Sequence, residues 1–141
     1  MERIKIDDGS KLYEIVNTDD RVIGKFAFNP SDANLVAKYE AVIEKLQDYF
    51  KEIQAGVMTK ERFIEAQDTI VDKFSELVGE DASKTFFSIC GPFTPMANGN
   101  LYLETVIEAV YGIIEKETKK RMKKVQSQMD KYLDGYKENR E

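Results

Sequence analysis

The chain has 141 residues, a formal net charge of −5 and no histidine. The missing histidine excludes His-based zinc sites, Ser–His and Cys–His nucleophile pairs and imidazole acid–base catalysis. A single cysteine, Cys90, excludes an internal disulfide and is typical of a reducing compartment. No signal-peptide core and no apolar run of about 18 residues is present, so we expect one soluble, cytoplasmic domain.

Three short strands are predicted before residue 29. The segment "RIKID" alternates Ile4 and Ile6 with charged residues, and "KLYEIV" and "RVIGKFAF" are rich in β-forming residues. The clusters "DDGS" and "NTDD" between them are typical of turns. We therefore expect residues 1–28 to form an antiparallel β-meander, whose apolar face needs a cover.

Helices are predicted over residues 29–89. In "NPSD", Asn29 is a candidate N-cap, Pro30 suits the first helical position and Asp32 complements the helix dipole. The apolar stripe that follows recurs at steps of three and four: Val36, Tyr39, Ile43, Leu46, Phe50 and Ile53. This pattern predicts a helix that begins at Pro30.

Two further helices follow in this region. Thr59 is the candidate cap of a helix that ends at Gly79 and has an apolar stripe of Phe63, Ala66, Ile70, Phe74 and Leu77. A short helix with Phe86 and Phe87 is predicted to begin after Asp81.

Residues 90–100, "CGPFTPMANGN", are rich in proline and glycine and predict a loop, and residues 101–136 predict one long helix. The predicted fold class is α+β: a small N-terminal three-stranded antiparallel sheet followed by a helical bundle with a long C-terminal helix. A helix of this length exceeds the diameter of a compact domain, so its last turns should project from the core.

The second half of this long helix has a narrow apolar seam, which we define as Met122, Val125, Met129 and Tyr132; Tyr136 continues the spacing. Steps of three and four residues are typical of a coiled-coil contact, and Met suits adaptable binding surfaces. We expect the seam to bind protein, either another copy or a client helix. The alternative is that the helix bends back and buries the seam in its own monomer.

Two loop residues, Phe93 and Met96, lie among prolines and glycines. Apolar loop tips often bind partners, and two heptads are too few for a stable coiled coil alone. We therefore group Phe93 and Met96 with the seam as candidate partner-binding residues, or expect the seam to cooperate with neighbouring copies. The alternative is that both side chains pack under the long helix.

Other candidate sites have simpler interpretations. Three carboxylate pairs, Asp7–Asp8, Asp19–Asp20 and Glu40–Glu44, could bind Mg²⁺ or act as acid and base, but turns and an exposed helix face explain them better. Cys90 fits a small buried side chain better than a reactive thiol. We expect no catalytic residue, no metal and no cofactor.

Charge is unevenly distributed along the chain. Residues 115–141 hold nine Lys or Arg and six Asp or Glu, whereas residues 1–114 hold 12 and 20, which gives net charges of +3 and −8. The basic run "KKRMKK" at 119–124 could attract phosphate, but no aromatic residue lies inside it to stack on a base. A solvated or protein-facing helix face is the better interpretation, and we do not expect nucleic acid or a membrane as a partner.

The layout resembles the small tail-assembly chaperones of long-tailed bacteriophages and prophages of Gram-positive bacteria. The resemblance rests on "FNPSDANLVAKYE", on the "SICGPFTPMANGNLYLE" junction and on the terminal "KKVQSQMDKY" helix. It implies a non-enzymatic protein that works in many copies in the bacterial cytoplasm, coating the tape measure protein and keeping it soluble until tail-tube subunits polymerise around it.

Other functions remain open at this point. A phage tail or virion structural subunit is the nearest alternative, and a basic-helix nucleic-acid-binding or regulatory module is the alternative from another class. A metal-dependent carboxylate enzyme is a more distant one. An acidic body with a projecting amphipathic helix and no recognisable catalytic motif favours the chaperone.

Overall fold

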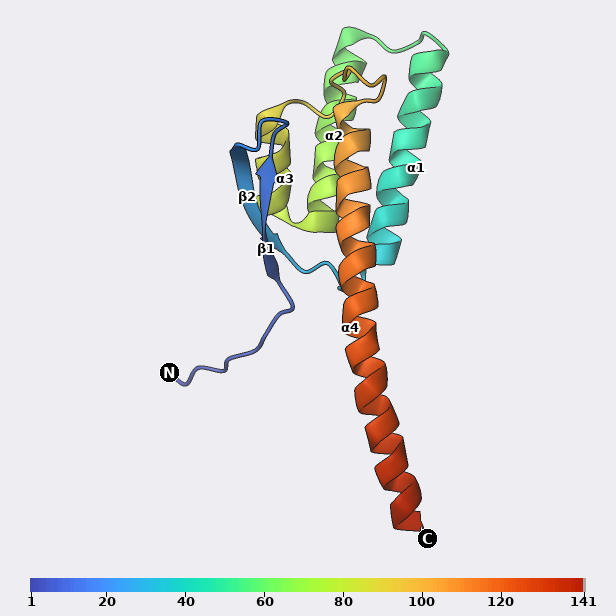
Figure 1. The fold of residues 1–141 in the computed structure, drawn as a ribbon. Coiled ribbons are helices and arrows are strands. Elements are labelled where there is room, and N and C mark those ends of the chain that lie inside the picture. Colours follow the sequence, from blue (N-terminus) through green and yellow to red (C-terminus); the bar gives the residue numbers. More distant parts are fainter. Residues whose placement is uncertain (141) are drawn as a thin grey trace.

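The computed structural model describes residues 1–140, with side chains described as far as Gly135. Two strands and four helices follow one another along the chain, which makes the fold α+β (Figure 1). The elements are β1 (Lys11–Val16), β2 (Val22–Phe28), α1 (Leu35–Gln54), α2 (Lys60–Val78), α3 (Glu80–Ile89) and α4 (Tyr102–Arg140). Among the described residues, no helix has both the length and the apolar character that crossing a membrane requires.

The sheet has two strands, so the predicted third strand at "RIKID" is wrong. Ile4 and Ile6 are almost fully exposed, because nothing covers this segment and its alternation has no apolar face to pack against. Asp7 and Asp8 each accept a hydrogen bond from the backbone N–H two residues later, so their side chains favour turns over a β-ladder.

The antiparallel pairing of β1 and β2 places Tyr13 opposite Phe26, with their ring centroids 5.5 Å apart. Phe26 and Phe28 are buried on the inner face of this hairpin. α3 supplies the cover that the sheet needs, since the ring of Phe86 lies 5.0 Å from that of Phe26 and Thr85 Oγ1 donates to the Lys25 carbonyl at 3.2 Å.

α1 begins at Leu35 and not at Pro30, so the predicted cap at Asn29 is also wrong. The Asn29 Oδ1 accepts from the N–H of Ser31 at 3.0 Å, and the Asp32 Oδ1 accepts from the N–H of Asn34 at 2.9 Å. These two local bonds hold residues 29–34 in turns, because they satisfy the backbone without a helix. The observed N-cap, Asn34, makes no capping bond with its side chain.

The buried stripe of α1 differs from the predicted one. Leu46 is buried as expected, but the other buried residues are Leu35, Val42 and Tyr49. Val36 and Ile53, which the spacing had included, are exposed. Tyr39, Ile43 and Phe50 are partly buried against the core, so the prediction is wrong only at the two ends of the stripe.

α2 forms as predicted. Thr59 caps it, because its Oγ1 accepts from the N–H of Arg62 at 3.1 Å, and Gly79 ends it with φ of +92°. Four residues of its predicted stripe are buried: Ala66, Ile70, Phe74 and Leu77. α3 contains Phe86 and Phe87, also as predicted.

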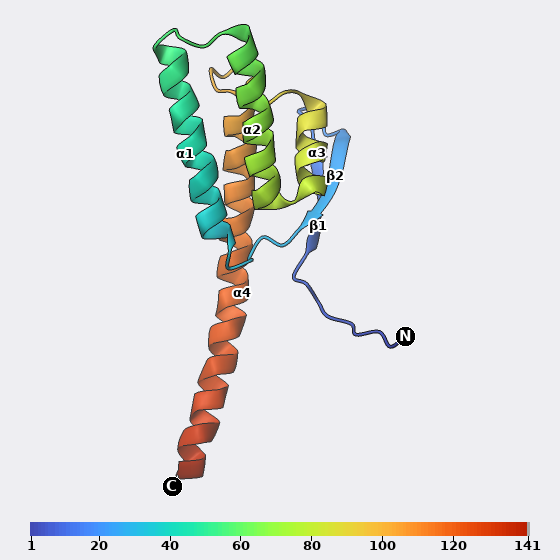
Figure 2. The ribbon, with the colours of Figure 1, turned by 180° about the vertical axis from the view of Figure 1, so that it is seen from behind.

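Residues 90–100 form a loop, and the long helix α4 follows it. Pro95 of the loop makes an isolated β-bridge with Leu101, the residue just before α4. The phenol of Tyr102 donates to the Phe86 carbonyl at 2.8 Å, and burial raises its pKa to about 12. Leu103, Val106, Ile107 and Val110 then pack into the core. α4 overlaps α2 in both views, with α1 on one side and the hairpin and α3 on the other, and it continues well past the end of the bundle (Figures 1 and 2).

Candidate functional site

The seam is exposed along the projecting part of α4, residues 122–140, which we call the tail. The exposed fractions are 46% for Met122, 41% for Val125, 57% for Met129 and 77% for Tyr132. Both views show the tail clear of the bundle and of the hairpin. The structure therefore does not show the alternative in which the helix bends back over its own core. The side chain of Tyr136 lies outside the described residues.

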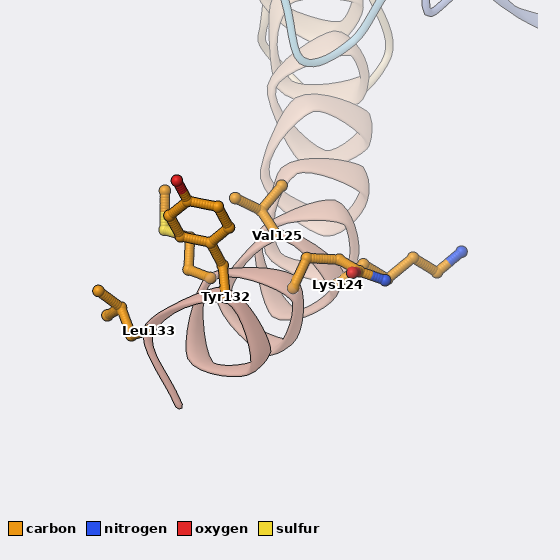
Figure 3. A pocket seen from close by; sticks show the side chains of 6 residues that line it. Lys124, Val125, Tyr132 and Leu133 are labelled. Atoms are coloured by element: carbon orange, nitrogen blue, oxygen red, sulfur yellow. The ribbon is translucent and has the colours of Figure 1, made fainter. Parts of the chain in front are cut away.

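Leu133 joins the seam, although its spacing had not pointed to it. With Val125, Met129 and Tyr132 it lines a shallow, open and almost entirely apolar groove on the tail. Figure 3 shows Val125, Tyr132 and Leu133 on one side of the helix, with the Lys124 side chain directed away from them. Exposed apolar side chains that adjoin in this way mark an interaction surface more often than single ones do.

A set of polar contacts holds α4 at the point where it leaves the bundle. Glu117, only 8% exposed, accepts from the Nζ of Lys11 at 2.8 Å. The hydrogen bond from Lys11 lowers the pKa of Glu117, and the same bond raises the pKa of Lys11. Arg121 donates to the Asn29 Oδ1 at 3.1 Å and to the Gly9 carbonyl at 3.0 Å.

These contacts form a collar, which we define as Gly9, Lys11 and Asn29 around Glu117 and Arg121 of α4. Asn29 Nδ2 also donates to the Asp8 carbonyl at 2.9 Å, which ties the N-terminal segment to the turn before α1. Asn29 therefore acts in the collar and not as a helix cap, because its Nδ2 donates to Asp8 and its Oδ1 accepts from Arg121. The tail begins directly after this collar.

The apolar surface extends from the tail onto the bundle. Tyr111 and Ile114 of α4 line a groove with Val36 and Tyr39 of α1, and Val36 is 68% exposed. A second groove, lined by Tyr111, Ile114 and Thr118, connects this region to Met122. The sequence analysis placed the seam in the second half of the helix only and so missed this upper part, although the spacing of three and four residues continues from Met122 back to Tyr111.

We name the whole surface the α4 stripe. It consists of seven residues on one face of the helix: Tyr111, Ile114, Thr118, Met122, Val125, Met129 and Tyr132. The stripe begins beside α1 and continues onto the tail. Thr118, near its middle, is half-buried, and its Oγ1 donates to the Ser31 Oγ at 3.2 Å and to the Pro30 carbonyl at 3.4 Å.

Phe93 and Met96 are not part of this surface. Phe93 is 4% exposed, and its ring lies 5.9 Å from that of Tyr49 and 5.5 Å from that of Phe63. Met96 is half-buried and packs against the same core. Their loop lies at the end of the bundle opposite to the tail (Figure 1). Within one chain the structure therefore does not bring the two loop residues together with the seam.

The basic run at 119–124 is partly occupied by contacts inside the chain. Arg121 belongs to the collar, and the Nζ of Lys119 lies 3.4 Å from the Oε1 of Glu115. Lys120, Lys123 and Lys124 are exposed. Lys119 is also exposed, so a nucleic-acid strand would meet four exposed lysines and no aromatic residue within the run.

The remaining candidate residues, the Asp pairs and Cys90, have contacts that fit a structural role. Asp7 and Asp8 accept turn hydrogen bonds, and Asp20 occupies a β-turn with φ of +61°. Cys90 is half-buried against the core. Among the side chains that the structure describes, those of residues 1–135, no three metal-ligating groups come together.

Comparison with protein-family models, with curated proteins and with solved structures finds no match to the chain.

Proposed function

We propose that this chain is a non-enzymatic protein-binding module that holds an apolar client helix along the seam of its tail. The observation that carries this proposal is the exposure of Met122, Val125, Met129 and Tyr132 on a helix that stands clear of its own bundle. An amphipathic helix with an unpaired apolar face can receive a second helix in the way that helix-in-groove complexes do.

The chemistry of the seam suits a client of variable sequence. Met is flexible and polarizable, so two methionines can adapt to different side chains, and Tyr132 adds a large apolar ring with a polar end. The net charge of −5 favours solubility of the complex, since like-charged particles repel one another.

The resemblance to phage tail-assembly chaperones supplies the identity of the client. We propose that the client is the tape measure protein, a long helical chain that needs apolar surface covered until the tail tube forms around it. Many copies of this chain would bind along one client. The identity of the client rests on the resemblance alone. The exposed seam requires only that the partner be an apolar helix.

The test is co-expression with a phage tape measure protein, followed by measurement of soluble client. Met122→Lys with Met129→Lys places two positive charges on the seam, and we expect soluble client to fall to the level seen without chaperone. The matched control, Ser127→Lys with Asp134→Asn, changes the net charge by the same amount on the opposite face of the tail and should keep client soluble.

Each other outcome identifies an alternative. If both double variants solubilise the client equally, the client does not bind the seam. If the chain enters purified tails in stoichiometric amounts, it is a tail structural subunit. If it is retained on DNA or heparin in a salt-sensitive way through its exposed lysines, the nucleic-acid-binding module is the better description.

A further inference from the structure

The α4 stripe has a symmetric spacing apart from Met122, whose counterpart by symmetry is Arg121 of the collar. Six of its residues lie at equal distances on either side of a point between Arg121 and Met122, with steps of three, four, seven, four and three: Tyr111, Ile114, Thr118, Val125, Met129 and Tyr132. Met122 itself lies next to that point. A pattern that reads the same in both directions is what a two-fold antiparallel contact requires, because each copy must present the same surface to the other.

We infer that two copies of this chain pair antiparallel through the α4 stripe. In this pairing Tyr111 of one copy faces Tyr132 of the other, Ile114 faces Met129, and Thr118 faces Val125. Each contact occurs twice. The collar of each copy then lies close to the centre of the pair, and the two bundles lie at opposite ends.

The length of the stripe supports this arrangement. The seam alone is about two heptads, which is short for a two-stranded coiled coil, whereas the stripe from Tyr111 to Tyr132 is about three. Its 22 residues span roughly 32 Å at 1.5 Å per residue. Antiparallel pairing therefore uses the upper part of the stripe, which a contact between tails alone would leave uncovered.

The groove on the bundle provides a seat for the tail of the second copy. Val36 and Tyr39 of α1 border Tyr111 and Ile114 there, and the rings of Tyr39 and Tyr111 lie 5.6 Å apart. Tyr132 and Leu133 of the other copy would arrive at this level and cover Val36. This accounts for an apolar α1 residue that is 68% exposed in the single chain.

Charge favours the antiparallel direction over the parallel one. Residues 1–114 carry a net charge of −8, whereas the tail, residues 122–140, holds five Lys or Arg and three Asp or Glu and so carries a net charge of +2. Parallel pairing would place two acidic bundles side by side, whereas antiparallel pairing places each basic tail against the other acidic bundle. Glu40 lines the groove that would receive the tail. The second copy is therefore the occupant that the charges favour.

The first test is sedimentation of the purified full-length chain without any client. We expect a concentration-dependent species of twice 16.2 kDa. Met122→Lys with Met129→Lys should abolish it, and Ser127→Lys with Asp134→Asn should preserve it. Circular dichroism should show that both variants keep their helix content. A wild-type chain that stays monomeric at 100 μM or so would overturn the pairing.

Direction is tested by cysteine cross-linking in a Cys90→Ala background. We expect Met122→Cys to form a disulfide dimer, since this position lies near the two-fold axis. We expect a mixture of Tyr111→Cys and Tyr132→Cys chains to cross-link, whereas Tyr132→Cys alone should not, because its two copies would be about 32 Å apart. Efficient cross-linking of Tyr132→Cys alone would mean parallel pairing and would overturn the antiparallel model.

These measurements involve no client, so their results are independent of the proposed chaperone function. If the chain both pairs with a second copy and binds a client, the two partners share one surface. Added client should then convert the dimer into client-bound monomers, which the same sedimentation experiment detects.

Discussion

Lys11 and Glu117 are 106 positions apart in the sequence, and their side chains meet at 2.8 Å between Nζ and Oε1. This contact joins the start of β1 to α4 at the level where the helix leaves the bundle. Glu117 is buried and Lys11 is partly exposed, so the carboxylate has lost most of its water and depends on the ammonium group.

We expect the contribution of this pair to depend on pH. The pKa of Glu117 lies below its ordinary 4.5, so the stabilisation is complete above pH 4.5 and is lost as the pH falls through the lower folded-state pKa. The pKa of Lys11 lies above its ordinary 10.5, so stabilisation is complete below pH 10.5 and is lost as the pH rises through the higher folded-state pKa.

Glu117→Gln tests this dependence. Its melting temperature should lie below that of the wild type at neutral pH, and the gap should narrow both below about pH 4 and above about pH 11. Thermal unfolding followed by circular dichroism across the pH range measures the gap. A gap of constant size would show that Glu117 acts by packing alone.

Gly9→Ala should destabilise the collar. Gly9 has φ of +79°, and an added Cβ would lie 2.6 Å from the Asn29 Nδ2. We expect a loss of about 1–2 kcal/mol in the free energy of unfolding by urea. Gly112→Ala is the matched control, because its Cβ would meet nothing within 4 Å inside α4, and it should gain about 1 kcal/mol.

Thr59→Ala should cost about 1 kcal/mol of stability, since the Thr59 Oγ1 accepts the N–H of Arg62 at the start of α2. Asn34→Ala removes the N-cap residue of α1, whose side chain makes no such bond, and should change stability by less than about 0.5 kcal/mol. Urea unfolding of both variants gives the comparison. Equal losses would mean that Asn34 caps α1 in solution.

Phe93→Ala and Met129→Ala separate the core from the binding surface. Phe93 packs between Tyr49 and Phe63, so its truncation should cost about 3–5 kcal/mol. Met129 is exposed, and its truncation should leave stability within about 0.5 kcal/mol. Thermal unfolding at a protein concentration low enough to keep the chain monomeric decides the matter: a large loss for Met129→Ala would then place the seam in contact with its own chain.

Local signals predicted α2 well. Its cap at Thr59, its stop at Gly79 and its core residues Ala66, Ile70 and Phe74 all come from interactions within a few residues, which a sequence displays directly. The same holds for the existence of the long helix α4.

Tertiary partners explain where the predictions failed. Asn29 matches a capping residue in the sequence, but Asp8 and Arg121, which occupy its amide, are far away along the chain. The alternation of Ile4 and Ile6 is a β-pattern without a neighbouring strand or a cover, and no local signal reveals that absence.

The candidate site was predicted in part. The spacing identified Met122, Val125, Met129 and Tyr132, and the structure places all four on the surface. The composition of the loop led to the wrong prediction that Phe93 is exposed, because a proline-rich loop can cover a core as readily as it can project from one. The sequence analysis missed Tyr111 and Ile114, because an apolar helix half shows no difference between residues facing the core and those beside it.

α4 carries its core residues and its seam on one uninterrupted helix, so residue count alone sets the direction in which the seam faces. One residue inserted between Glu117 and Met122 would rotate everything beyond it by about 100° and move it outward by about 1.5 Å. Seven inserted residues would return the seam to within about 20° of its original bearing, about 10 Å farther out. The length of this segment therefore sets the direction of the seam, and only insertions that complete nearly whole turns, such as about 7, 11 or 18 residues, keep the seam within about 20° of its original bearing.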